Sequence, residues 1–279
     1  MIIHAGYNMI PALKKLWKEA FGDDDRYIDF FFNNRFRGEN TFVYMKNGFP
    51  VSMATVLNAS LYCNGAFLPA GYIYGVATSA VHRGKGLSTA ILEHINGIYP
   101  ATFLVPAAGE LFDFYKKRGF TPAFSLNEFN LHACDLQTPP KKITGKPVSP
   151  GEYKAIRDCH FQKNGYICWD TEAISYALAE NSFFGGAALK IQTDEKKGEN
   201  GVLLYRKQSG RLLIIETTLP MPILQDAAHN LMKQENAGEC SVRLASNETS
   251  IGRPFGLLRQ NTAYCAATVK NGYCSLVLD

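Results

Sequence analysis

The residues best suited to chemistry lie in a short basic loop, residues 83–88, which reads Arg-Gly-Lys-Gly-Leu-Ser. Gly84 and Gly86 can adopt backbone angles that bring amide N–H groups close to a ligand. Arg83 and Lys85 place positive charge beside those amides. A helical spacing of apolar residues begins directly after the loop, at Leu87, Ile91, Leu92 and Ile95. The unpaired amides and the dipole at the start of that helix favour an anion such as phosphate.

The loop is positioned at its N-terminal end by a predicted strand, just as the predicted helix positions its C-terminal end. Residues 72–78 read YIYGVAT and are apolar nearly throughout, as is typical of a strand inside a sheet.

Two common phosphate motifs do not fit the loop. Lys85 is followed by Gly86 rather than by Ser or Thr, which excludes a P-loop, and the third glycine of the dinucleotide fingerprint is missing.

The loop instead resembles the acetyl-CoA loop of the GCN5-related N-acetyltransferase (GNAT) family. That family's pattern is Arg/Gln-x-x-Gly-x-Gly/Ala, and residues 83–88 match it with Ser88 in the last place. The Ser88 hydroxyl would either crowd the pyrophosphate of CoA or bond to it. The resemblance implies that the loop amides bind this pyrophosphate and that the preceding strand pairs with the pantetheine arm. The CoA-binding residues it implies are Val76, Ala77, Thr78, Arg83, Gly84, Lys85, Gly86, Leu87 and Ser88.

A second match follows at residues 115–120, Tyr-Lys-Lys-Arg-Gly-Phe, where the family carries Tyr-x-x-x-Gly-Phe at the end of a helix. Attack of an amine on a thioester expels a thiolate, and a nearby hydroxyl can protonate it. The resemblance gives that catalytic role to Tyr115, and the alternative is a ring that packs beneath the pantetheine. No general base is identified, since His82 and Glu110 both have simpler explanations.

One difference from the family pattern indicates which branch of the family the chain resembles. Many members of the family have Asn seven residues before the tyrosine, where this chain has Ala108. The sequence LVPAA at residues 104–108 looks more like the Eis-type branch, in which two acetyltransferase-like domains follow one another. That branch adds a third domain whose final carboxylate acts as a base, and 279 residues are too few for all three. Whether Asp279 reaches the first site therefore stays open.

The remaining patterns predict two similar domains. Asn47-Gly48 and Asn64-Gly65 separate three strand-like runs ahead of the loop, as in a pair of hairpins. Residues 135–150, rich in proline and lysine, suggest a linker. Beyond it the order of two helices, strands and a helix recurs. There the loop reads Pro220-Met221-Pro222, which lacks the N–H donors that CoA would need.

We therefore expect an α/β chain of two tandem GNAT-like domains, each a mixed, mostly antiparallel twisted sheet flanked by helices. Residues 1–134 would form the acetyl-CoA-binding domain and residues 151–279 a degenerate copy, which shapes the acceptor side or a homo-oligomer. The aromatic run at residues 27–32 is assigned to core rather than to an acceptor pocket, and one of Asp23 to Asp25 is expected to cap a helix.

Composition excludes several classes of protein. A net charge of +4 with no basic stripe argues against nucleic-acid binding. No apolar run is long enough to span a membrane and no signal peptide is visible, so a cytoplasmic protein without membrane contacts is expected. Seven cysteines without a Cys-x-x-Cys pair, and histidines without ligand spacing, argue against disulfides and against a metal site.

The function expected from the resemblance is an acyl-CoA-dependent N-acetyltransferase, with acetyl-CoA as co-substrate and a small-molecule or peptide amine as acceptor. Two other functions stay open. Paired domains of this type also occur in aminoacyl and peptidyl transferases, which use a charged tRNA. A non-catalytic sensor of acyl-CoA would carry the same loop.

Overall fold

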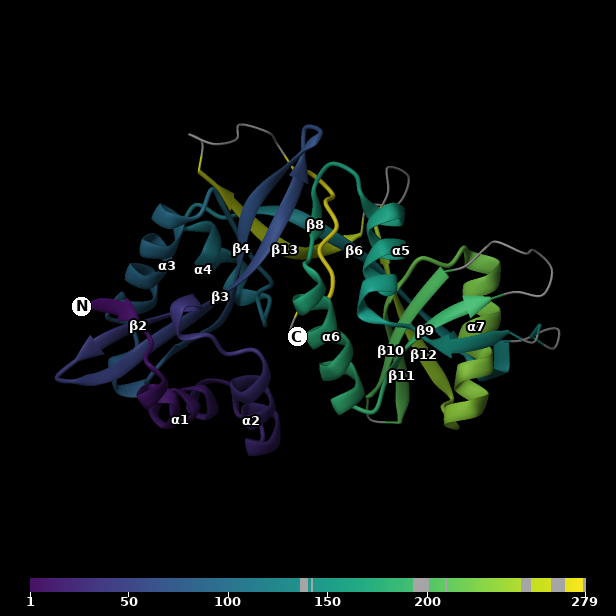
Figure 1. Cartoon of the computed structure of the whole chain (residues 1–279), viewed down its shortest axis with the longest axis horizontal. Helices are drawn as coiled ribbons and strands as arrows, with labels where there is room; N and C mark the ends of the chain where they lie inside the picture. The colour runs from purple at the N-terminus through teal and green to yellow at the C-terminus, as the bar shows by residue number, and fades with distance from the viewer. Residues whose placement is uncertain are drawn as a thin grey trace. The chain divides into compact units, whose positions relative to one another are not determined.

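The computed structural model describes residues 1–135, 140–141, 143–192, 201–208, 210–246, 252–261 and 269–277 (Figure 1). The chain divides into two compact units, and each is described by itself. Unit 1 comprises Met1–Leu61, Ala66–Pro122 and the described part of Gly256–Thr268. Unit 2 comprises Tyr62–Gly65, the described part of Ala123–Phe255, and that of Val269–Asp279.

Unit 1 is built on hairpins that follow two helices. Its elements in chain order are β1 (Ile2–His4), α1 (Ile10–Phe21), α2 (Asp25–Asn34), β2 (Thr41–Lys46), β3 (Phe49–Cys63), β4 (Ala66–Thr78), α3 (Leu87–Ile98), β5 (Ala101–Leu104) and α4 (Glu110–Lys116). The two expected Asn-Gly turns are confirmed. Both residues of each turn are left-handed, with φ of 50° and 82° at Asn47 and Gly48, and of 51° and 80° at Asn64 and Gly65. These angles suit the two-residue turns that match the twist of paired strands.

The helices of unit 1 cover opposite faces of its sheet. Tyr74 of β4 contacts Trp17 of α1 and Phe31 of α2, with ring centres 5.4 and 5.6 Å apart. Ile73, the next residue along the strand, instead belongs to the core that α3 and α4 complete. Tyr27, Ile28, Phe31 and Phe32 are buried, as expected of core residues, whereas Phe30 is half-buried.

The acidic residues between α1 and α2 fix the two helices. Asp24 is the N-cap of α2, and its side chain accepts a hydrogen bond of 2.7 Å from the Tyr27 amide. Asp23 accepts a hydrogen bond of 2.7 Å from the indole of the buried Trp17. A capping role for one of these aspartates is therefore confirmed.

Unit 2 repeats this order of elements. It holds β6 (Thr121–His132), β7 (Thr144–Pro147), α5 (Pro150–Phe161), β8 (Tyr166–Cys168), α6 (Thr171–Phe183), β9 (Ala187–Gln192), β10 (Gly201–Gln208), β11 (Arg211–Thr217), α7 (Met221–Glu235) and β12 (Glu239–Ala245). Strands β9, β10 and β11 pair antiparallel, and β11 then pairs parallel with β12 across α7. In unit 1, β4 pairs parallel with β5 across α3 in the same way.

The strand that follows each unit in the sequence pairs with a strand of the other unit. β6 follows α4 of unit 1 in sequence, yet it pairs antiparallel with β12 of unit 2. β13 (Arg253–Gln260) follows β12, yet it pairs antiparallel with β5 of unit 1, from Leu257 opposite Leu104 to Gln260 opposite Ala101. A single cut in the chain therefore cannot separate the units.

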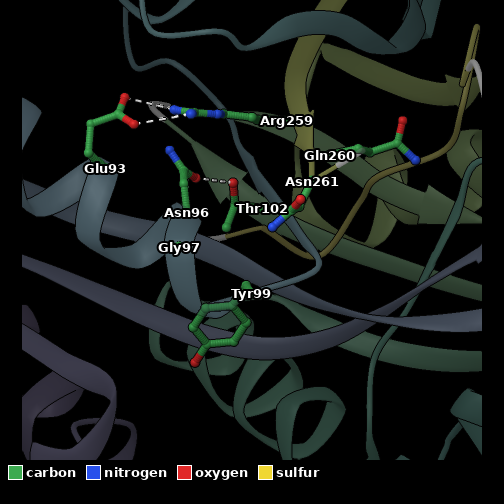
Figure 2. A pocket seen from close by; sticks show the side chains of 8 residues that line it. All are labelled: Glu93, Asn96, Gly97, Tyr99, Thr102, Arg259, Gln260 and Asn261. Atoms are coloured by element: carbon green, nitrogen blue, oxygen red, sulfur yellow. Dashed lines mark hydrogen bonds and ion pairs between the residues drawn. The ribbon is translucent and has the colours of Figure 1, made fainter. Parts of the chain in front are cut away.

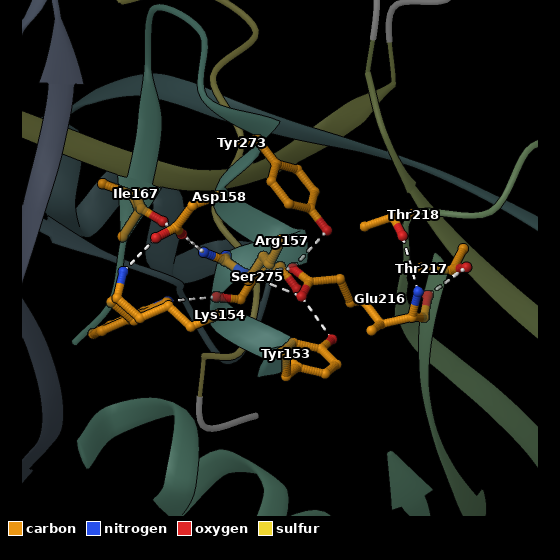
Figure 3. A network of polar contacts seen from close by, with 12 residues as sticks. Tyr153, Lys154, Arg157, Asp158, Ile167, Glu216, Thr217, Thr218, Tyr273 and Ser275 are labelled. Carbon is orange, nitrogen blue, oxygen red and sulfur yellow. Dashed lines mark hydrogen bonds and ion pairs between the residues drawn. The ribbon is translucent and has the colours of Figure 1, made fainter. Parts of the chain in front are cut away.

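A buried polar network holds unit 2 together (Figure 3). Arg157 of α5 and Glu216 of β11 are both fully buried, and the Arg157 Nε lies 3.0 Å from each Glu216 oxygen. The hydroxyls of Tyr153 and Tyr273 donate to the same carboxylate at 2.7 and 3.0 Å. Burial and this carboxylate raise the pKa of both tyrosines, so their hydroxyls stay protonated and donate.

Candidate active site

The strands β4 and β5 diverge where the site begins. They pair only from Ala70 opposite Ala101 to Tyr72 opposite Phe103, whereas β4 continues to Thr78 and β5 ends at Leu104. Gly75, three residues before the end of β4, has a φ of 62°, and this irregularity turns the strand where the pairing has stopped. The last residues of β4, Val76 to Thr78, therefore extend beyond β5 with an edge that an extended ligand can approach.

The 83–88 loop joins the end of β4 to α3 through two left-handed glycines. The φ is 72° at Gly84 and 74° at Gly86, and a Cβ added to either would meet nothing within 4 Å. Glycine is thus required for the backbone conformation and not for space. Gly86 is the N-cap of α3 and provides no side-chain cap. Leu87 and Ser88 lie in the first turn of α3, whose amides are left for an anion.

The two cations of the loop are exposed and fold back on the main chain. Arg83 Nε donates to the Thr78 carbonyl at 3.1 Å, and Lys85 Nζ donates to the Val81 carbonyl at 2.8 Å. His82 is held by the Ser79 hydroxyl, 2.8 Å from its Nδ1. These bonds keep positive charge beside the glycines, while His82 stabilises the turn.

Tyr115 lies on α4 with 8% of its surface exposed, in the same core as Val76 of β4 and Leu104 of β5. Its ring contacts Phe114 and Phe120 edge to face, at 5.1 and 5.9 Å between ring centres. Burial raises the pKa of Tyr115 to about 12, and the Arg118 charge partly opposes this. Among the described residues its hydroxyl makes no hydrogen bond, so it stays available as a donor.

Arg118 ties the helix that carries Tyr115 to the helix that follows the loop. Its Nε and Nη2 donate to the Thr89 hydroxyl of α3 at 2.9 and 2.7 Å. Its guanidinium lies 3.4 Å from the centre of the Phe114 ring. Its role in joining two helices depends on Thr89, which is far away in the sequence.

The raised pKa predicts how stability changes at high pH. Tyrosine in an unfolded chain ionises at about pH 10, so between about pH 10 and 12 the unfolded state binds fewer protons than the folded state. Stability therefore falls as the pH rises through this window. Between about pH 9.5 and 11.5 we expect wild type to lose about 2 kcal/mol more than Tyr115→Phe. Urea unfolding at the two pH values measures this, and equal losses would contradict it.

The family model for the acetyltransferase (GNAT) domain matches residues 2–123. This segment therefore resembles a GNAT acetyltransferase domain. The matched segment contains the divergent strands, the 83–88 loop and Tyr115. The match supports an acyltransferase enzyme. No curated protein matches the chain.

Solved structures share the fold over most of the chain. A probable N-acyltransferase from Enterococcus faecalis has 16% identity and a TM-score of 0.72, covering 93% of this chain and 72% of its own. A GCN5-related N-acetyltransferase from Anabaena variabilis has 16% identity and a TM-score of 0.73, covering 95% and 74%. Eis1 from Mycobacterium abscessus has 11% identity and a TM-score of 0.65, covering 93% and 73%. At these identities the likeness shows a common fold.

Among the described residues no group of three or more His, Cys, Asp or Glu could hold a metal ion. In the same part of the chain no helix is both long and apolar enough to cross a membrane. Asp279, whose reach to the first site was left open, lies outside the described residues.

Proposed function

We propose that this GNAT domain transfers an acetyl group from acetyl-CoA to a primary amine of a small molecule or peptide, by direct attack. The observation that carries the proposal is the 83–88 loop. Two left-handed glycines precede the start of α3, which has no side-chain cap. They directly follow β4, whose last residues no longer pair with β5. A pyrophosphate and an extended arm are the two features that this arrangement suits.

In this proposal, different residues bind the pyrophosphate, the pantetheine arm and the thioester of acetyl-CoA. The amides of Gly84, Gly86 and the first turn of α3 bind the pyrophosphate, and Arg83 and Lys85 leave their carbonyl partners to neutralise it. The backbone of Val76, Ala77 and Thr78 pairs with the pantetheine arm. The thioester then lies where β4 and β5 diverge, beside the core that contains Tyr115.

Tyr115 acts on the departing sulfur. A thiol ordinarily ionises near pH 8.5, about 3.5 units below the pKa of about 12 for Tyr115. Complete proton transfer from this phenol to a thiolate is therefore uphill by about 4 to 5 kcal/mol. Donation of a hydrogen bond costs no such transfer and stabilises the charge that develops on sulfur. The proton can then come from the ammonium formed on the acceptor.

We also propose that unit 2 is a GNAT-like copy that has lost its CoA site. The parallel pair of β11 and β12 around α7 supports the likeness to β4, α3 and β5. The N-cap of α7 is Pro220, and Pro222 lies in its first turn. Both prolines lack the amide hydrogens that would bind a pyrophosphate.

A thiol-release assay tests the catalytic proposal. Purified protein, acetyl-CoA and a panel of primary amines are combined with a reagent that reports free CoA. Release that depends on one class of amine is the expected result. Binding of acetyl-CoA without release by any amine would leave a sensor, and turnover only with charged tRNA would indicate an aminoacyl transferase.

Ser88 is the one residue of the loop that departs from the family pattern, and its side chain can be tested directly. It occupies the first turn of α3 and is half-buried. If the hydroxyl bonds to the pyrophosphate, Ser88→Gly should weaken acetyl-CoA binding about three- to tenfold, the effect of one hydrogen bond of about 1 kcal/mol. Tighter binding by the variant, measured by calorimetry, would mean that the hydroxyl crowds the phosphate.

A further inference from the structure

A polar cavity of about 340 Å³ lies in unit 1 at the far end of α3 (Figure 2). Its walls come from the last turns of α3, the start of β5 and the end of β13, and include Glu93, Asn96, Tyr99, Thr102, Arg259 and Gln260. Asn96 follows Ser88 by eight helical residues, which corresponds to roughly 12 Å. The volume suits a small molecule, and the place is separate from the 83–88 loop.

Asn96 offers this cavity a buried donor in a fixed orientation. The Thr102 hydroxyl donates to Asn96 Oδ1 at 2.5 Å, and the two residues are 1% and 8% exposed. The amide oxygen is thereby used, and Asn96 Nδ2 has no partner among the described residues. Figure 2 shows this nitrogen turned toward Glu93 and Arg259. Gln260 Nε2 is a second buried donor without a partner in the same part of the chain.

Arg259 offers a fixed cation whose present partner is easily replaced. Its Nη1 and Nη2 donate to the two Glu93 oxygens at 2.7 and 3.1 Å. Its Nη1 also donates to the Arg118 carbonyl at 2.9 Å, which holds the guanidinium in place. The Glu93 side chain is 50% exposed, so solvent screens this ion pair and can hydrate the Glu93 carboxylate when it leaves Arg259.

We propose that this cavity binds a small monocarboxylate. The ligand carboxylate takes the place of Glu93 on Arg259, in the two-bond geometry that a guanidinium fork favours, and accepts a hydrogen bond from Asn96 Nδ2. A single charge fits better than a phosphate dianion, because Glu93 stays nearby and repels a second negative charge. The proposal does not depend on the transferase function.

Binding can be measured by ¹H–¹⁵N NMR with lactate as the probe, methyl lactate as its uncharged match and inorganic phosphate as the dianion. We expect lactate to shift the side-chain signals of Asn96 and Arg259, and the other two compounds to leave them unchanged. Equal shifts with phosphate would contradict a carboxylate site, and no shift with lactate would overturn the proposal.

Two variants test whether the ligand carboxylate replaces Glu93 on Arg259. Glu93→Gln removes the competing charge from an exposed position, and we expect lactate to bind about two- to fivefold more tightly. Arg259→Gln should lose the binding. Asp113→Asn, which breaks an exposed pair with Lys116 on α4, is the matched control and should not alter lactate affinity. Weaker binding by Glu93→Gln would overturn the proposal even if Arg259→Gln failed to fold.

Discussion

Replacing Tyr115 by phenylalanine is expected to lower kcat roughly 100-fold, the lower end of the range for loss of one hydrogen-bond donor that stabilises charge in the transition state. The change removes one hydroxyl and keeps the ring that contacts Phe114 and Phe120. Because the hydroxyl makes no hydrogen bond to any described residue, its loss should leave the fold and the acetyl-CoA affinity unchanged. Initial rates of CoA release at saturating amine measure the effect.

A matched control is Tyr205→Phe in unit 2. Burial also raises the pKa of Tyr205 to about 12, but its hydroxyl donates to Glu235 at 3.0 Å, outside the GNAT domain. This variant should retain the wild-type kcat. If Tyr115→Phe also turned over at the wild-type rate, the role of Tyr115 at the sulfur would be wrong, and its ring would serve only to pack the core.

Replacing Glu216 by alanine is expected to destabilise unit 2 by about 3 to 5 kcal/mol. The carboxylate accepts hydrogen bonds from Arg157, Tyr153 and Tyr273 in a fully buried setting. Its removal leaves the buried Arg157 charge with only the more distant Asp158 carboxylate, 3.9 Å away, and loss of the close partner costs more than the pair itself contributes. Hydrogen exchange of the amides of α5 and β11 reports the free energy of opening of this region.

Two variants separate the buried charge from general effects of mutation. Glu152→Ala breaks a partly exposed pair with Lys190, at 2.6 Å, and should cost at most about 1 kcal/mol. The double variant Arg157→Met/Glu216→Leu should be less destabilised than Glu216→Ala, because no unpaired charge remains. A loss below about 1 kcal/mol for Glu216→Ala would show that the network contributes little to stability.

The elements around the loop could be predicted because their signals are local. Asn47-Gly48 and Asn64-Gly65 need left-handed angles that few other residues adopt, and Gly84 and Gly86 mark the loop for the same reason. Burial of the α2 aromatics followed from helical spacing alone. In each case the residues that decide the conformation are neighbours in the chain.

The exchange of strands could not be predicted, because an apolar strand does not encode its partner. FGLLRQ at the end of β13 would complete either sheet equally well by its pattern, and only the assembled core places it beside β5. Glu216 and Arg157 present a related difficulty. Charged residues are usually exposed, and their burial becomes evident only when two segments far apart in sequence meet.

A calorimetric titration with acetyl-CoA tests the central claim most directly, which is that the 83–88 loop of unit 1 binds this cofactor and unit 2 does not. We expect one site per chain. Gly86→Ala should weaken it, because a non-glycine residue at this left-handed position costs about 1 to 2 kcal/mol and no neighbour would clash. Absence of binding by wild type, or two sites per chain, would contradict the claim.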